Sequence, residues 1–72
     1  MLKRGDKGKE VREMASGLCA LDYLSADCVD DEFDFNKQES VRLFQADAGL
    51  VETGIFDDET RRALNKRLAQ RG

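Results

Sequence analysis

Residues 41–64 read VRLFQADAGLVETGIFDDETRRAL and contain the end of one helix, a loop and the start of another. Val41 and Phe44 begin an apolar series at helical spacing, which predicts a helix with one buried face. Gly49 follows directly and suits the left-handed residue that ends many helices. Asp57 stands before two further acids, as expected for the N-cap of the next helix. The stretch therefore predicts a helix–loop–helix unit.

The same reasoning applied outward predicts three helices, at about residues 9–21, 37–48 and 58–69. Asn36 is the expected N-cap of the second helix, with Glu39 completing a capping box. The predicted apolar faces consist of Val11, Met14, Ala15, Leu18 and Leu21 in the first helix, Val41, Phe44 and Ala48 in the second, and Ala63, Leu64 and Leu68 in the third.

The loops at residues 22–35 and 49–56 contain a repeated motif. Residues 32–34 read EFD and residues 55–57 read IFD, and a predicted helix follows each. Two such loop–helix units would each place a phenylalanine under a helix and bury a shared core. We expect short extended pairs near the two phenylalanines.

Length and composition limit the possible functions. The 72 residues allow one domain, spanning 1–72 with a core at about 2–69, and the pattern predicts a compact all-α fold. The net charge of −3 argues against binding to nucleic acid, and no apolar run approaches the ~20 residues of a membrane helix. Because the chain has no histidine, histidine-dependent nucleophilic sites and the usual zinc sites are excluded. We therefore expect neither an enzyme nor a cofactor.

Several motifs keep a spacing that resembles one known family, the small peptidoglycan-binding domain. They are LKRGDKGKEV at 2–11, LCALDYL at 18–24, VDDEFD at 29–34, VRLFQ at 41–45, GL at 49–50, TGIFDDET at 53–60 and AL at 63–64. Members are compact three-helix modules appended to wall hydrolases, amidases, carboxypeptidases and phage lysins. The resemblance implies the same fold, no catalytic activity, and binding to the cell wall.

Five positions depart from the family pattern. Asp31, Asp34 and Asp57 stand where the family has glycine. Lys37 replaces a frequent threonine, and Arg61 replaces a frequent aromatic residue. Aspartate tolerates left-handed backbone better than most residues, so we expect the fold to survive with a more acidic surface. The preference for ligand would change if these loops border the binding groove.

Six residues are the predicted contacts to ligand: Asp31, Asp34, Phe35, Lys37, Arg42 and Gln45. The loop carboxylates could meet amino groups of a wall stem peptide, although a solvated loop that caps helices is the alternative. Arg42 and Gln45 are expected to point away from the core, where an arginine could bind carboxylates in bidentate fashion. Ordinary helix surface explains these two positions equally well. Phe35 either packs on the following helical turn or is exposed.

Other candidate sites are weaker. An EF-hand counted from Asp30 would need glycine at Phe35 and glutamate at Val41, so calcium binding is not expected. Tyr23 could stack on a sugar, but packing at the end of the first helix is the preferred interpretation. Cys19 and Cys28 could form a disulfide, and free thiols are slightly favoured.

The expected function is non-catalytic binding of peptidoglycan by a monomer, at the stem peptide or the sugar–peptide junction. The module would target an attached or associated wall hydrolase, as in endolysins. The alternative is a protein–protein adaptor with the same fold, which the aspartates at glycine positions favour. The first residues do not form a signal peptide, so location is left open, with the cell wall or periplasm as the site of action.

Overall fold

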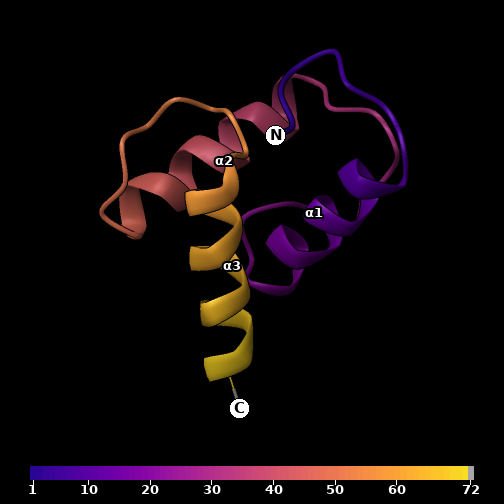
Figure 1. Cartoon of the computed structure of the whole chain (residues 1–72). Coiled ribbons are helices and arrows are strands. Elements are labelled where there is room, and N and C mark those ends of the chain that lie inside the picture. Colours follow the sequence, from indigo (N-terminus) through magenta and orange to yellow (C-terminus); the bar gives the residue numbers. More distant parts are fainter. Residues whose placement is uncertain (72) are drawn as a thin grey trace.

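The computed structural model describes residues 1–71, which form three α-helices and a short 3₁₀-helix and contain no strand (Figure 1). The all-α fold is therefore as predicted. The elements in chain order are α1 (Lys9–Ala20), η1 (Ala26–Cys28), α2 (Phe35–Asp47) and α3 (Asp58–Gln70). None of the helices in the described part is long and apolar enough to span a membrane.

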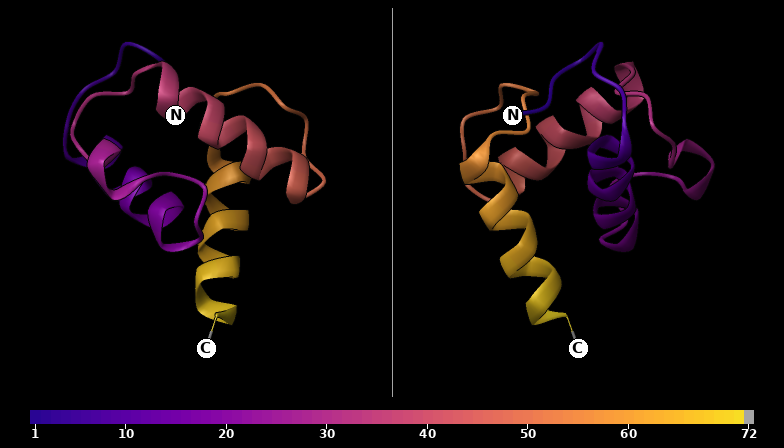
Figure 2. Two further views of the ribbon diagram at one scale, coloured as in Figure 1. Left: turned by 180° about the vertical axis from the view of Figure 1, so that it is seen from behind. Right: turned by 45° about the vertical axis from the view of Figure 1, so that its right-hand side comes forward.

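The core lies where α1 packs against both α2 and α3. Figure 2 shows the last turns of α3 extending beyond this packed region. All three phenylalanines predicted to be internal are buried, as are four of the five residues in the predicted face of α1. The buried apolar residues are Leu2, Val11, Met14, Ala15, Leu18, Leu24, Phe33, Val41, Phe44, Phe56 and Leu64.

The N-terminal segment joins the two loops through isolated antiparallel bridges. Leu2 exchanges backbone hydrogen bonds with Phe56, at 3.0 and 2.8 Å between nitrogen and oxygen. Lys7 pairs with Glu32, and the Phe33 amide donates to the Asp6 carbonyl at 2.9 Å. These contacts confirm the extended pairs expected near the two phenylalanines. They fix both loops over the same end of the core (Figure 1).

The start of α2 differs from the prediction. The helix begins at Phe35, and the Asp34 carboxylate accepts from the Lys37 amide at 3.0 Å, so Asp34 is the N-cap. Asn36 lies inside the first turn. Glu39 pairs with Arg42 at 3.1 Å and forms no capping box. The physical reason is that Phe33 must be buried, which places the turn into the helix directly after it and gives Asp34 the extended backbone of a cap.

Two helices end in the same hydrogen-bonded motif. After α1 the Tyr23 amide donates to the Leu18 carbonyl at 2.9 Å, across Asp22 with a φ of 67°. After α2 the Leu50 amide donates to the Gln45 carbonyl at 2.8 Å, across Gly49 with a φ of 76°. Both are Schellman ends, which need one residue in the left-handed region. The predicted role of Gly49 is therefore confirmed.

Candidate functional site

The six residues predicted to bind ligand lie at different depths in the structure. Asp31, Phe35 and Arg42 are exposed, Asp34 is half-buried, and Lys37 and Gln45 are buried. The set therefore does not form one continuous surface. It combines exposed groups with internal groups that hold the loops in place.

Lys37 has no exposed surface, and its ammonium group binds the loop that precedes α2. Its Nζ lies 2.6 Å from an Asp30 carboxylate oxygen and 3.7 Å from an Asp34 oxygen. The hydrogen bond from Lys37, followed by one from the Glu32 amide, lowers the pKa of the Asp30 carboxyl below its ordinary value. A fully buried lysine with these partners touches no ligand directly. Its structural effect is to fix the acidic loop against α2.

Gln45 is also internal, and the expectation that it points away from the core is wrong. Its exposed fraction is 1%. Its Nε2 donates to Thr53 Oγ1 at 3.2 Å, to the Ile55 carbonyl at 3.0 Å and to Thr60 Oγ1 at 3.0 Å. Its Oε1 accepts from the amides of Thr53 and Gly54, each at 3.0 Å. One amide side chain thus joins α2 to three residues of the following loop and to Thr60 in the first turn of α3.

The exposed aromatic residue of the site is Phe35, at the start of α2. Phe35 is 53% exposed as a residue, and the Arg4 guanidinium lies 5.5 Å from the centroid of its ring. A hollow of about 230 Å³ lies beside it, and its charged lining residues are Arg4, Lys7, Glu32 and Asp34. Arg42 follows Phe35 by two helical turns and so lies on the same side of α2. An apolar ring and several charges thus meet on one face.

Asp31 lies apart from that face and contacts α1. One of its carboxylate oxygens accepts from Arg12 Nε at 2.6 Å, and both side chains are more than half exposed. An exposed ion pair of this kind contributes little to folding. Asp31 is therefore available to exchange its partner for a ligand.

Tyr23 is half-buried and packs against the core at the end of α1, as the preferred interpretation expects. Its ring meets Phe44 edge to face, with centroids 5.6 Å apart. The hydroxyl donates to Asp47 Oδ2 at 2.5 Å and accepts from Arg67 Nη1 at 3.1 Å. Burial, and then the Asp47 carboxylate, raise the pKa of the Tyr23 hydroxyl. The residue links the end of α1 to α2 and α3 rather than presenting a stacking surface.

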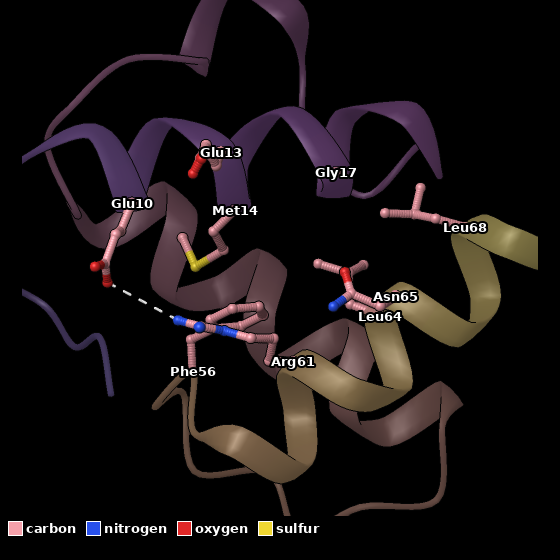
Figure 3. A pocket seen from close by; sticks show the side chains of 9 residues that line it. All are labelled: Glu10, Glu13, Met14, Gly17, Phe56, Arg61, Leu64, Asn65 and Leu68. Atoms are coloured by element: carbon pink, nitrogen blue, oxygen red, sulfur yellow. Dashed lines mark ion pairs between the residues drawn. The ribbon is translucent and has the colours of Figure 1, made fainter.

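A second hollow, of about 440 Å³, lies between α1 and α3, and none of the six predicted residues lines it. Figure 3 shows its two walls and its apolar interior. The lining residues are Glu10, Glu13, Met14, Gly17, Phe56, Arg61, Leu64, Asn65 and Leu68. One signal in the sequence points to it. Gly17 interrupts a helix at a cost of roughly 1 kcal/mol relative to alanine, which suggests a steric role.

The steric role of Gly17 is visible in the structure. A Cβ atom at this position would lie 3.2 Å from Leu64 Cδ2 and 3.3 Å from Leu68 Cδ1. The absence of a side chain thus lets α3 approach α1 at one end of the hollow. Towards the other end the helices separate, and charged residues stand on both sides (Figure 3).

Metal ligands do not gather anywhere in the described residues, where no group of three or more acidic, histidine or cysteine side chains is suited to a metal ion. Cys19 and Cys28 are half-buried free thiols.

Comparison with protein-family models finds a match to the model described as a putative peptidoglycan binding domain, over residues 7–64. A search of curated proteins finds no match. The matched range includes α1, α2, both loops and the first half of α3.

Proposed function

Because the chain belongs to the family of putative peptidoglycan binding domains, we propose that it binds bacterial peptidoglycan without acting on it chemically. The observation that carries this proposal is the match over residues 7–64, which includes α1, α2, both loops and the first half of α3. Two exposed groups on the same side of α2 are chemically suited to a ligand that combines sugars with peptides. Phe35 offers an apolar ring face, and Arg42 offers a guanidinium.

The module would target an attached or associated wall-acting enzyme to its substrate. A domain with principal extents of 27 × 25 × 16 Å can bury only part of a wall ligand, so we expect weak binding. Weak binding suffices for targeting, because a tethered enzyme gains local concentration at the wall.

The proposal that the domain is non-catalytic rests on the residues available to it. The sequence has no histidine, and the exposed groups of the candidate site are the Phe35 ring, the Asp31 carboxylate paired with Arg12, and the Arg42 guanidinium paired with Glu39. We expect the purified chain to release no soluble fragments from peptidoglycan. Release of muropeptides above a buffer control would refute this part of the proposal.

Co-sedimentation with purified sacculi tests the binding. We expect the wild type to pellet in a saturable manner, and Phe35→Ala and Arg42→Ala each to weaken binding by about fivefold, a loss of ~1 kcal/mol. Leu43→Ala is the matched control, because Leu43 lies on the same helix and is 59% exposed. Equal pelleting of all four proteins would remove Phe35 and Arg42 from the binding surface.

A protein–protein adaptor with the same fold is the second candidate. The exposed apolar residues Leu43 and Val51 favour it, because they lie on α2 and on the loop that follows. If the wild type stays in the supernatant at high excess of sacculi and moderate salt, wall recognition is refuted, and a search for a protein partner then tests the adaptor function.

A further inference from the structure

The groove between α1 and α3 carries opposite charges on its two walls (Figure 3). Glu10 and Glu13 stand on α1, and Arg61 stands on α3. The nearest approach is 3.9 Å between Arg61 Nη2 and Glu10 Oε2, which is too long for a good hydrogen bond. The Glu10 side chain is 69% exposed and the Arg61 side chain 44% exposed. An acid and a guanidinium thus lie side by side with most of their bonding capacity unused.

Two further polar side chains of the groove, Glu13 and Asn65, also have unused capacity for hydrogen bonds. Within residues 1–71, neither Glu13 nor Asn65 uses its side chain in an ion pair or a hydrogen bond. Asn65 can both donate to and accept from a peptide group. Arg61 is partly held in place, because its guanidinium lies 5.8 Å from the centroid of the Phe56 ring. The charged end of the groove is therefore ordered on one side and open to solvent.

The interior of the groove is apolar. Met14, Leu64 and Phe56 line it with almost fully buried side chains. Figure 3 shows the Met14 side chain descending from α1 towards Phe56 and Arg61. A thioether of this kind adapts its shape to an aliphatic chain. The volume of about 440 Å³ lies in the range of small-ligand sites.

We propose that this groove binds the free end of a wall peptide in which an ammonium group and a carboxylate group share one carbon atom. The proposal rests on the proposed function, since peptidoglycan is the source of the peptide. The ammonium would lie between Glu10 and Glu13, and the carboxylate would accept from Arg61. The aliphatic chain behind this end group would lie over Met14 and Leu64, and Asn65 would bind a peptide group of the stem.

The charge pattern selects this end group over a simple amine. A side chain that ends in an amine alone would satisfy the two glutamates and leave Arg61 without a new partner. A carboxylate alone would meet repulsion from the two glutamates. A group that carries both charges on one carbon atom matches an acid and a guanidinium whose nearest atoms lie 3.9 Å apart.

The test is a titration of the ¹⁵N-labelled chain, followed by amide NMR, with two soluble muropeptides. One contains diaminopimelate, whose free end carries an ammonium and a carboxylate on one carbon, and the other contains lysine in its place. We expect saturable shifts at the amides of Met14, Gly17 and Asn65 with the first. We expect binding of the second to be roughly tenfold weaker, which is the effect of one lost charge-assisted contact.

Variants separate the groove from the rest of the surface. Arg61→Gln should reduce the difference between the two muropeptides to less than about twofold, and Glu13→Gln should weaken both. Arg62→Gln is the matched control, because Arg62 is the exposed neighbour of Arg61 on α3 and does not line the groove. All these residues are at least partly exposed, so folding should be retained, which far-ultraviolet circular dichroism would verify.

The outcomes distinguish this inference from the proposed function. Sacculus binding by the wild type together with equal affinity for both muropeptides, or with shifts confined to α2, would overturn the groove assignment and leave wall binding standing. An Arg61→Gln variant that discriminates as the wild type does would also overturn it. Failure to bind sacculi and both muropeptides would overturn both.

Discussion

Gln45 is a buried polar residue on which the stability of the fold should depend. Its five side-chain hydrogen bonds end on Thr53, Gly54, Ile55 and Thr60, and three of them use backbone groups. Gln45→Leu keeps a similar volume but leaves buried donors and acceptors without partners, each of which costs about 1–3 kcal/mol. We expect a loss of about 2–4 kcal/mol in the free energy of unfolding, measured by urea denaturation.

Gln70→Leu is the control for that measurement, because it makes the same chemical change at an exposed position in the last turn of α3. It should change the free energy of unfolding by no more than about 0.5 kcal/mol. A loss below about 1 kcal/mol for Gln45→Leu would show that water replaces the missing bonds.

Asp57 makes stability depend on pH at the acid end. Its carboxylate accepts from the Thr60 amide at 2.9 Å, and the hydrogen bonds from Thr60 lower the pKa of the Asp57 carboxyl below its ordinary value of 3.8. Because the pKa of the Asp57 carboxyl is lower in the folded than in the unfolded state, its ionisation stabilises the folded protein at pH values above the unfolded-state pKa. This stabilisation disappears as the pH falls through the folded-state pKa.

Asp57→Asn tests this dependence, because asparagine also caps helices but does not titrate in this range. We expect the wild type to be the more stable protein at neutral pH, since an anion at a helix start is favoured. Its advantage should vanish as thermal unfolding is repeated from about pH 6 down to about pH 2. If the stability difference between the wild type and Asp57→Asn stayed constant across that pH range, the Asp57 carboxyl would not be the source of the pH dependence.

At the scale of the elements, both Schellman ends favour glycine at the left-handed position, so adding glycine at one end and removing it at the other should have opposite effects on stability. Asp22 holds a φ of 67°, where a residue with a Cβ is strained, so Asp22→Gly should stabilise the protein by up to about 1 kcal/mol. Gly49→Ala imposes that strain at a φ of 76° and should destabilise it by about 1–2 kcal/mol. Chemical denaturation of both variants measures the two effects.

Ala20→Gly is the control for the glycine substitutions. Ala20 is the last residue of α1, and glycine there should destabilise the helix by roughly 1 kcal/mol or less. Asp22→Gly and Ala20→Gly each add the backbone freedom of one glycine to the unfolded chain. If the first raises the free energy of unfolding and the second lowers it, the difference reports the strain of the left-handed backbone at Asp22. A loss of stability in Asp22→Gly would mean that the aspartate makes a compensating interaction.

The helix boundaries show how far local patterns determine the elements. The apolar periods located all three helices to within two residues, and Asp57 and Gly49 act as predicted. The start of α2 was misjudged because Asn36 and Asp34 are both good caps in isolation. The choice between them depends on the burial of Phe33, which is a contact with the rest of the molecule.

At the scale of the whole molecule, the small size predicts a gain from duplication. With a radius of gyration of 10.7 Å, one copy offers little surface to the wall. When two copies are joined by a flexible linker, binding of the first raises the local concentration of the second at the wall. We expect the tandem protein to bind sacculi about 10²-fold more tightly than the single chain. A single chain fused to an inert domain of equal size is the control. Equal binding by tandem and control would indicate that neighbouring wall sites cannot be reached together.

The sequence by itself determined the all-α class, the three helices, the internal phenylalanines and the family, because apolar periods, caps and motif spacing are local properties. Only the tertiary structure decided which polar residues are internal. Lys37 and Gln45 look like surface residues in a helical pattern, yet both are buried because groups 7 to 15 residues away, in the loops and in α3, complete their bonds. The groove likewise joins Glu10 and Glu13 to Arg61, and no local pattern reports the packing of one helix against another.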